Sequence, residues 1–345
     1  MVVLGRTDER GASGHLGRYR ARDGSAGARV SIDLDRPHAV AVVGKRGSGK
    51  SHTLGVLAEE LAAAPGVAPV VVDLMGAFRT LAADPVDARV VEPRVAAGSL
   101  GPRAWCSLLD LDPESGPGSL VWRAADERET LAAMREHVAD ADAPPATRRA
   151  AANHLHLADA WSAFDPDGLG AAALVDGPVV LDCAGLDRAP ANAVLAAVAT
   201  LLYEARLADA VDALPWLLVD EAHAADGVAE GALRRLLTRG RQPGVSTVLA
   251  TQRPAALPDV AVSQSDLLVS HRLTDRADRE ALRAARPAYV AGTVDERLPS
   301  ATGEALVVDD ATESAHEIRV RERETPHGGD SPRASALIDG SGRPG

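Results

Sequence analysis

Lysine and aromatic side chains are scarce in this sequence of 345 residues. Aromatic residues make up 3% of the chain, and arginine supplies all but two of its 37 basic side chains. The two lysines, Lys45 and Lys50, stand in one short glycine-rich segment. A composition that avoids lysine everywhere else has kept both there, which makes that segment the first candidate for a functional site.

Long apolar runs are also missing. No stretch approaches the roughly 20 consecutive apolar residues that a membrane-spanning helix needs. The N-terminal residues lack the basic-then-apolar pattern of a secretory signal. We therefore expect a cytoplasmic protein that does not enter a membrane.

Cysteine is limited to Cys106 and Cys183, which have neither CxxC nor metal-ligand spacing. We expect two small buried thiols rather than a disulfide or a metal site. Four of the ten histidines, His52, His223, His271 and His316, share no ligand spacing. A metal site built from histidines is not expected.

The net charge of −12 arises from 49 acidic and 37 basic residues. A carboxylate-rich surface with arginine in place of lysine is typical of a salt-loving organism with GC-rich codons, because such a surface stays hydrated. Codon bias alone would explain the arginine but not the acidity. The acidity removes the usual basic-charge argument for nucleic acid binding, although a local arginine cluster could still carry such a contact.

Apolar runs with little alternation predict the fold class. A strand at His38–Val43 precedes the glycine-rich segment, and the spacing of leucines predicts a helix at Ser51–Ala64. Five more runs have strand length: Pro69–Asp73, Pro178–Asp182, Trp216–Asp220, Ser246–Thr251 and Leu267–Arg272. Near-continuous apolar strands are covered on both faces, so we predict an α/β protein of three layers with a mostly parallel central sheet. Such sheets bind ligands at the carboxyl ends of their strands.

The remaining segments suggest the domain organisation. Residues 1–36 hold one or two short edge strands, and residues 37–325 form the core. An insertion at about 91–176 contains a Gly/Pro-rich turn at Asp112–Gly118 and helices near Glu127–Asp140 and Thr147–Trp161. Glu304–Asp309 and His316–Glu322 predict a final hairpin, and residues 326–345 are expected to be disordered.

The glycine-rich segment matches the phosphate-binding pattern GxxxxGK[ST] in full. Its residues are Gly44, Lys45, Arg46, Gly47, Ser48, Gly49, Lys50 and Ser51. Its glycines let successive backbone N–H groups face phosphate oxygens at a helix N-terminus. Lys50 can reach the β- and γ-phosphates of ATP, and the Ser51 hydroxyl can bind Mg²⁺. We count the next residue, His52, among the nucleotide-binding residues.

Asp220 and Glu221 follow an apolar strand and suit the second motif of such a site. Asp220 would hold the Mg²⁺ shell, and Glu221 would act as general base on the attacking water. His223 completes an Asp-Glu-Ala-His string that also occurs in two-lobed helicases. A chain of this length has room for one such lobe and an insertion, which disfavours that interpretation.

Further polar residues lie near other strand ends. Gln252 follows the run that ends at Thr251 and could contact the γ-phosphate or the attacking water. Arg239 and Arg241 could reach a neighbouring subunit's phosphates, or could belong to a solvated helix face. Asp73 and Asp182 end strands as well, and could orient water or only cap turns.

Together these strings resemble the HerA branch of the HerA/FtsK family of ring-forming ATPases. The segments that carry the resemblance are GKRGSGKS, VVVDLMGAF, PWLLVDEAH and RGRQPGVSTVLATQRP. The resemblance covers roughly residues 30–325. Within that branch, the sequence resembles haloarchaeal ATP-binding proteins. The resemblance implies a RecA-like core, magnesium-dependent ATP hydrolysis at subunit interfaces, a hexamer, and translocation of double-stranded DNA as a helicase or related motor. It also implies a nuclease partner, a γ-phosphate contact from Gln252, and a trans-acting arginine at Arg239 or Arg241.

Two features differ from the family pattern. Residues 1–35 are too short for the β-barrel with which members commonly begin, and Gly76 is followed by Ala77 where the family tends to have glutamate. A regulatory or assembly ATPase that switches a protein partner is therefore the alternative function. A secretion-type motor would need a membrane anchor.

Overall fold

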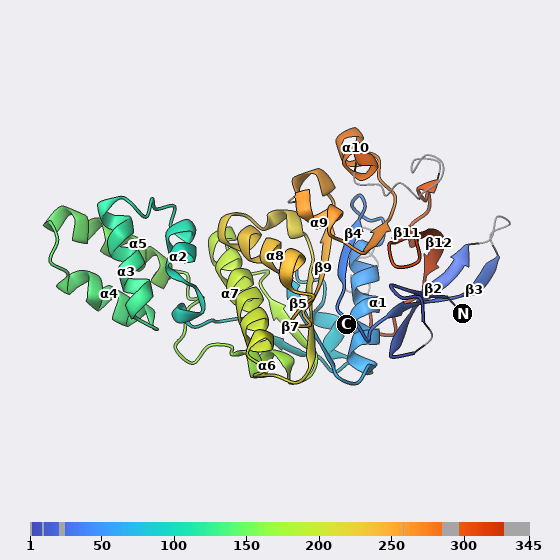
Figure 1. Cartoon of the computed structure of the whole chain (residues 1–345), viewed down its shortest axis with the longest axis horizontal. Coiled ribbons are helices and arrows are strands. Elements are labelled where there is room, and N and C mark those ends of the chain that lie inside the picture. The colour runs from blue at the N-terminus through green and yellow to red at the C-terminus, as the bar shows by residue number, and fades with distance from the viewer. Residues whose placement is uncertain (1, 9, 21–24, 258, 285–296, 328–345) are drawn as a thin grey trace, which may run out of the picture.

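The strands of this protein form a single mixed sheet in a computed structural model that describes every residue except 1, 9, 21–24, 258, 285–296 and 328–345. The described sheet has 12 strands in the order β1-β3-β2-β12-β11-β10-β4-β9-β8-β5-β7-β6. Helices flank its parallel half, and a helical arm extends beyond β6 and β7 (Figure 1). This arrangement confirms the predicted α/β class.

The parallel half of the sheet carries the predicted apolar runs. Its strands are β10 (Leu267–Ser270), β4 (Ala39–Val43), β9 (Ser246–Thr251), β8 (Leu214–Val219), β5 (Val67–Asp73), β7 (Val179–Asp182) and β6 (Arg89–Val91). Each pairs with its neighbours in parallel. The carboxyl ends of β4, β8 and β9 therefore lie at one edge of the sheet, where the predicted nucleotide motifs meet.

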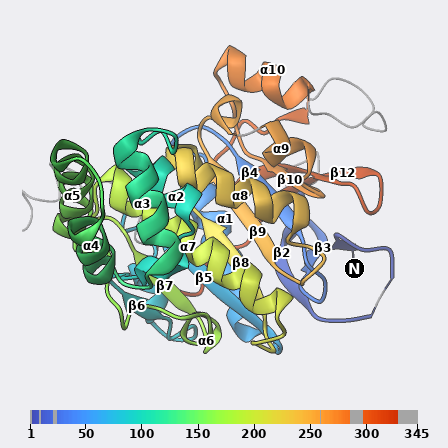
Figure 2. The same ribbon diagram turned by 60° about the vertical axis from the view of Figure 1, so that its left-hand side comes forward.

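Helices cover both faces of the parallel strands, as the absence of alternation predicted. One face packs against α1 (Lys50–Ala63), where Leu54 and Leu57 join Val40 and Leu218 in one buried cluster. The other face packs against α7 (Arg188–Leu207) and α8 (Gly227–Arg239), which lie over the sheet in Figure 2. Successive residues of each strand therefore point to opposite faces of the sheet and pack into two separate hydrophobic cores. The sheet and the helices on its two faces form the three layers.

The antiparallel half of the sheet joins the two ends of the chain. Its strands are β11 (Glu304–Asp309), β12 (Ser314–Val320), β2 (Ser13–Arg20), β3 (Ala26–Asp33) and β1 (Val2–Leu4). The predicted C-terminal hairpin is confirmed as β11 and β12. The expectation of one or two N-terminal edge strands was wrong, since the described part of residues 1–36 contains three strands. Pairing of β2 with β12 supplies hydrogen bonds from residues some 300 positions away, which no local pattern reveals.

The insertion forms a helical arm. Its helices are α2 (Pro102–Leu108), α3 (Gly116–Glu127), α4 (Leu131–Asp140) and α5 (Pro145–Ala160), and α6 (Ala171–Val175) leads back to β7. The predicted helices correspond to α4 and α5. The expected turn at Asp112–Gly118 is wrong in its second half, because α3 begins at Gly116. The Ser115 hydroxyl accepts a hydrogen bond from the Gly118 N–H, and proline suits the first helical turn.

Packing ties this arm to the core. Trp105 is fully buried, its indole N–H donates to the Ala97 carbonyl over 3.0 Å, and its ring centroid lies 4.8 Å from that of Phe164. The buried side chains of the arm belong to the same cluster as those of α7 and α8. The arm is therefore continuous with one of the two cores.

Short helices complete the chain: α9 (Asp259–Ser263), α10 (Arg276–Ala284) and the 3-10 turns Arg79–Ala82, Ala97–Ser99, Ala222–Ala224 and Pro254–Ala256. No helix in the described ranges is both long and apolar enough to cross a membrane. Cys106 and Cys183 are buried free thiols, as expected. Of the tail expected to be disordered, only Pro326 and His327 fall among the described residues.

Candidate nucleotide-binding site

The loop between β4 and α1 has the backbone of a phosphate cradle. Gly47 and Gly49 have φ values of 71° and 117°, a left-handed region that favours glycine. The Lys45 N–H donates to the Arg272 carbonyl over 2.8 Å, which fixes the start of the loop beside β10. A Cβ atom at Gly44 would lie 2.5 Å from the Ser48 hydroxyl oxygen, so no larger residue fits there. Glycine is thus required by both torsion and space.

Lys50 and Ser51 open α1 at the base of this loop. Lys50 is buried, and its ammonium donates to the Lys45 carbonyl over 3.3 Å. Burial lowers the pKa of Lys50, while the nearby carboxylates of Glu221 and Asp220 act to raise it. Negative charge close to Lys50, whether from these carboxylates or from bound phosphate, therefore favours the charged form of its ammonium group.

Asp220 directly follows β8 and meets the phosphate loop. The Ser51 hydroxyl donates to Asp220 Oδ2 over 2.8 Å, and Asp220 Oδ1 accepts from the Glu221 N–H over 2.9 Å. Burial raises the pKa of the Asp220 carboxyl, and the hydrogen bond from Ser51 acts against that rise. The two predicted metal ligands are thus in direct contact.

Glu221 adopts a conformation that is uncommon for a residue other than glycine. Its φ is 52°, in the left-handed region. Its Oε1 accepts a hydrogen bond from the Gln252 side-chain amide, which comes from the end of β9. Its Oε2 lies 3.2 Å from His223 Nδ1 and is buried without a hydrogen bond. One oxygen of the predicted base is therefore held by Gln252, and the other lies beside His223.

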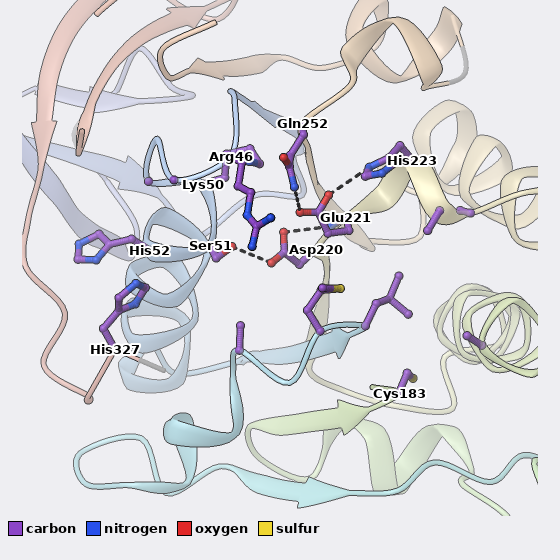
Figure 3. A pocket seen from close by; sticks show the side chains of 18 of the residues that line it. Arg46, Lys50, Ser51, His52, Cys183, Asp220, Glu221, His223, Gln252 and His327 are labelled. Atoms are coloured by element: carbon purple, nitrogen blue, oxygen red, sulfur yellow. Dashed lines mark hydrogen bonds and ion pairs between the residues drawn. The ribbon is translucent and has the colours of Figure 1, made fainter. Parts of the chain in front are cut away.

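An open pocket of about 1090 Å³ extends over these residues. In Figure 3 Ser51, Asp220, Glu221 and Gln252 turn toward one another beneath it. His52 lies on the wall beyond the loop, with its Nε2 atom 2.7 Å from the Arg321 carbonyl oxygen and its ring 5.7 Å from that of His327.

The two candidate arginines lie outside this constellation. Arg239 ends α8 and Arg241 follows it, so both precede β9 and lie at the edge of the sheet opposite the phosphate loop. Arg241 is exposed, and its Nη2 atom is 3.6 Å from Asp266 Oδ2 just before β10. Neither arginine serves the phosphate loop of its own chain.

Asp73 and Asp182 have structural partners. Asp73 is fully buried and accepts hydrogen bonds from the backbone N–H groups of Met75, Ala77 and Phe78. Asp182 pairs with Arg79 over 2.5 Å. The Asp73 contacts are those of a turn cap, the simpler of the two alternatives.

Sequence reasoning missed His271, which follows β10 beside the loop. His271 is fully buried; its Nδ1 atom is 2.8 Å from the Glu304 carbonyl oxygen and its Nε2 atom is 2.9 Å from the Thr53 hydroxyl. Burial lowers its pKa to about 4, so the ring is neutral at pH 7 and packs against Gly44 and Gly49. The only signal in the sequence was a polar residue at the end of an apolar run.

Comparison with known proteins finds a relative of the first part of this site. The family model described as "Helicase HerA, central domain" matches residues 15–137, a range that contains β4, the phosphate loop and α1. This part of the chain is therefore similar to the HerA central domain. A search of curated proteins finds no match to it.

Solved structures share the fold of this chain. VirB4 of Thermoanaerobacter pseudethanolicus is 17% identical and superposes with a TM-score of 0.71, over 93% of this chain and 99% of that one. The bacterial conjugative coupling protein TrwBΔN70 is 14% identical, with a TM-score of 0.60 over 87% of this chain and 88% of that one. At these identities the likeness concerns the fold alone, and it confirms the predicted P-loop ATPase architecture.

Proposed function

We propose that this HerA-like ATPase is a magnesium-dependent motor that assembles as a homo-hexamer and moves duplex DNA. The observation that carries the catalytic part is the convergence of Ser51, Asp220, Glu221 and Gln252 beneath one pocket. The match to the central domain of the helicase HerA supports DNA as the substrate.

The described residues fit a magnesium ion. The Ser51 hydroxyl and the Asp220 carboxylate are hard oxygen ligands 2.8 Å apart at the mouth of the phosphate loop. Mg²⁺ bound there with ATP would offset negative charge on the phosphates. Burial disfavours the charged form of the Asp220 carboxyl, and a cation bound beside it would favour that form.

Each remaining residue has one task in hydrolysis. Backbone N–H groups of the loop and the Lys50 ammonium bind the β- and γ-phosphates. Glu221 accepts a proton from the attacking water through the oxygen that has no hydrogen bond. Gln252 holds the other Glu221 oxygen and so orients the carboxylate toward the pocket.

Two substitutions test the catalytic part. Lys50→Ala should abolish ATP binding, because it removes the buried cation of the loop. Glu221→Gln should keep ATP binding and lose turnover by about 10²–10⁴-fold, because the base is needed only in the chemical step. Nucleotide binding and phosphate release are measured in high salt with magnesium. Glu230→Gln, on α8 outside the pocket, is the matched control and should retain turnover. Wild-type turnover in Glu221→Gln would show that the assigned base is wrong.

The motor part is tested by molar mass and by DNA. We expect a hexamer with ATP and magnesium, and an ATPase rate that rises with duplex DNA and falls as salt weakens phosphate contacts. A monomer or dimer whose ATPase rate ignores DNA across a salt titration would reject the motor. That outcome would favour the regulatory ATPase, for which the net charge of −12 is the supporting observation.

A further inference from the structure

Arg46 stands at the tip of the phosphate loop with its side chain in the pocket. It is exposed and lines the cavity together with Lys50, Ser51 and Asp220. In Figure 3 its guanidinium group extends from the loop toward Ser51 and Asp220. No ion pair joins Arg46 to any residue in the described ranges. An arginine without a carboxylate partner thus faces the place where phosphate oxygens would lie.

The neighbouring cation is placed differently. The Lys45 backbone is fixed on both sides, since its N–H donates to the Arg272 carbonyl and its carbonyl accepts from Ser48 N–H over 3.2 Å. The side chain of Lys45 is absent from the lining of the pocket. Of these two adjacent basic residues, Arg46 lines the pocket and Lys45 does not.

Two other arginines line the pocket, and neither takes the place of Arg46. Arg188 lies across the pocket at the start of α7 and pairs with Asp226 over 2.7 Å. Arg319 comes from β12 in the antiparallel half of the sheet, whereas Asp220 and Glu221 follow β8 in the parallel half. Arg46 is the pocket arginine that extends toward the predicted metal ligands.

The geometry points to Arg46 as a catalytic cation that acts within its own chain, donating hydrogen bonds to the γ-phosphate oxygens of ATP. This inference rests on the proposed ATPase function of the same site. A guanidinium group offers two parallel N–H donors to phosphate oxygens and stays protonated at every working pH. Because the transition state spreads negative charge over the γ-phosphate oxygens, a fixed cation there stabilises it more than the bound substrate.

Arg46 neither gives nor accepts a proton in the hydrolysis step. Water forms a bond to the γ-phosphorus, and the bond from that phosphorus to the β-γ bridging oxygen breaks. The electron pair leaves with ADP, and the proton of the water passes to Glu221. Arg46 keeps its protons throughout and contributes only charge and hydrogen bonds.

The test compares Arg46→Ala, Arg46→Lys and the matched control Arg149→Ala, which removes an exposed arginine of α5 on the helical arm. Arg46→Ala should lower kcat about 10²–10³-fold while the affinity for ADP changes less than about threefold. Arg46→Lys should recover part of kcat, and Arg149→Ala should stay near wild type. A second readout is capture of ADP with aluminium fluoride, which mimics the transferring phosphoryl group. Wild type and Arg149→Ala should capture it tightly and Arg46→Ala should not.

The outcomes separate this inference from the proposed function. A wild-type chain that hydrolyses ATP together with an Arg46→Ala variant equal to it would overturn the role of Arg46 alone. Loss of ADP binding and of thermal stability in Arg46→Ala would also overturn it, since that would make the residue structural. Recovery of Arg46→Ala activity on mixing with Lys50→Ala subunits would show that the arginine acts between chains. A wild-type chain without turnover would reject the proposed ATPase site itself, and Arg46 with it.

Discussion

His38 interacts with two carboxylates at the edge of the sheet opposite the nucleotide site. It is buried immediately before β4, with Nδ1 2.6 Å from Asp266 Oδ2 and Nε2 3.4 Å from Asp33 Oδ2. Burial disfavours its charged form, yet the hydrogen bond to the Asp266 carboxylate and the neighbouring Asp33 carboxylate raise its pKa to about 9. Arg6 and Arg36 also contact Asp33, and Arg241 contacts Asp266, so these arginines share the carboxylates.

This pKa predicts a stability loss at alkaline pH. The folded-state pKa of His38, about 9, exceeds the ordinary 6.5, so its contribution is complete below pH 6.5 and is lost as pH rises through 9. The free energy of unfolding should fall by about 2–3 kcal/mol between pH 6.5 and 9.5. Urea unfolding across that range measures it. His38→Gln should remove most of this slope, and the exposed His156→Gln should keep it. An unchanged slope in His38→Gln would contradict the assignment.

At the scale of elements, α1 is held by a segment from the far end of the chain. Glu59 is buried on α1, and its Oε1 accepts hydrogen bonds from the Thr325 N–H over 2.9 Å and the Thr325 hydroxyl over 2.7 Å. Its Oε2 lies 2.7 Å from Arg321 Nη1, and Arg321 also pairs with Glu60. The segment after β12 is therefore fixed along the helix that carries Lys50 and Ser51.

Breaking this contact should cost stability. Glu59→Ala leaves the buried guanidinium group of Arg323, which lies 3.6 Å from Glu59 Oε1, and the buried Thr325 N–H without their carboxylate, which typically costs about 3–5 kcal/mol. We expect a loss of about 3 kcal/mol in the free energy of unfolding, measured by urea denaturation in high salt. Glu324→Ala, whose side chain is exposed in the same segment, should change stability by less than about 0.5 kcal/mol. Equal effects of the two substitutions would show that the buried contact contributes nothing specific.

For the whole molecule, the sheet separates the phosphate loop from the arginines that follow α8. Arg241 is exposed beside Asp266 at the amino ends of β9 and β10, whereas Gln252 and Lys50 lie at the carboxyl ends of β9 and β4. An arginine in that position cannot reach the nucleotide of its own chain. It can serve a second copy, which is what a ring with sites at its subunit interfaces requires.

A mixing experiment tests this prediction. Arg241→Ala should lose turnover, and so should Lys50→Ala. A mixture of the two variants should regain part of it, because Lys50→Ala subunits supply Arg241 to intact phosphate loops of their neighbours. ATPase rate against mixing ratio is the measurement, with Arg239→Ala tested in the same way. An Arg241→Ala variant with full turnover would leave Arg241 in the alternative role of a solvated helix residue.

The sequence alone determined the core of the site and, except for β6, the parallel half of the sheet. Uninterrupted apolar runs specify strands buried on both faces, and parallel strands bring their carboxyl ends to one edge. Lys50, Ser51, Asp220, Glu221 and Gln252 could therefore be placed together without coordinates, because Lys50 and Ser51 follow the loop after β4 and the others follow β8 or β9 directly. Such residues can be predicted from local sequence patterns, because they lie close in sequence to the strand that positions them.

Only the tertiary structure decided the rest. The N-terminal strands pair with β12, His271 supports Gly44 from a neighbouring strand, and Glu59 holds Thr325, all across large separations in the chain. Such contacts leave no periodic signal, because hydrogen bonding and burial depend on which distant segment arrives. The same is true of the direction of a side chain: the sequence places Arg46 and Lys45 next to each other, and only the folded loop turns Arg46 into the pocket.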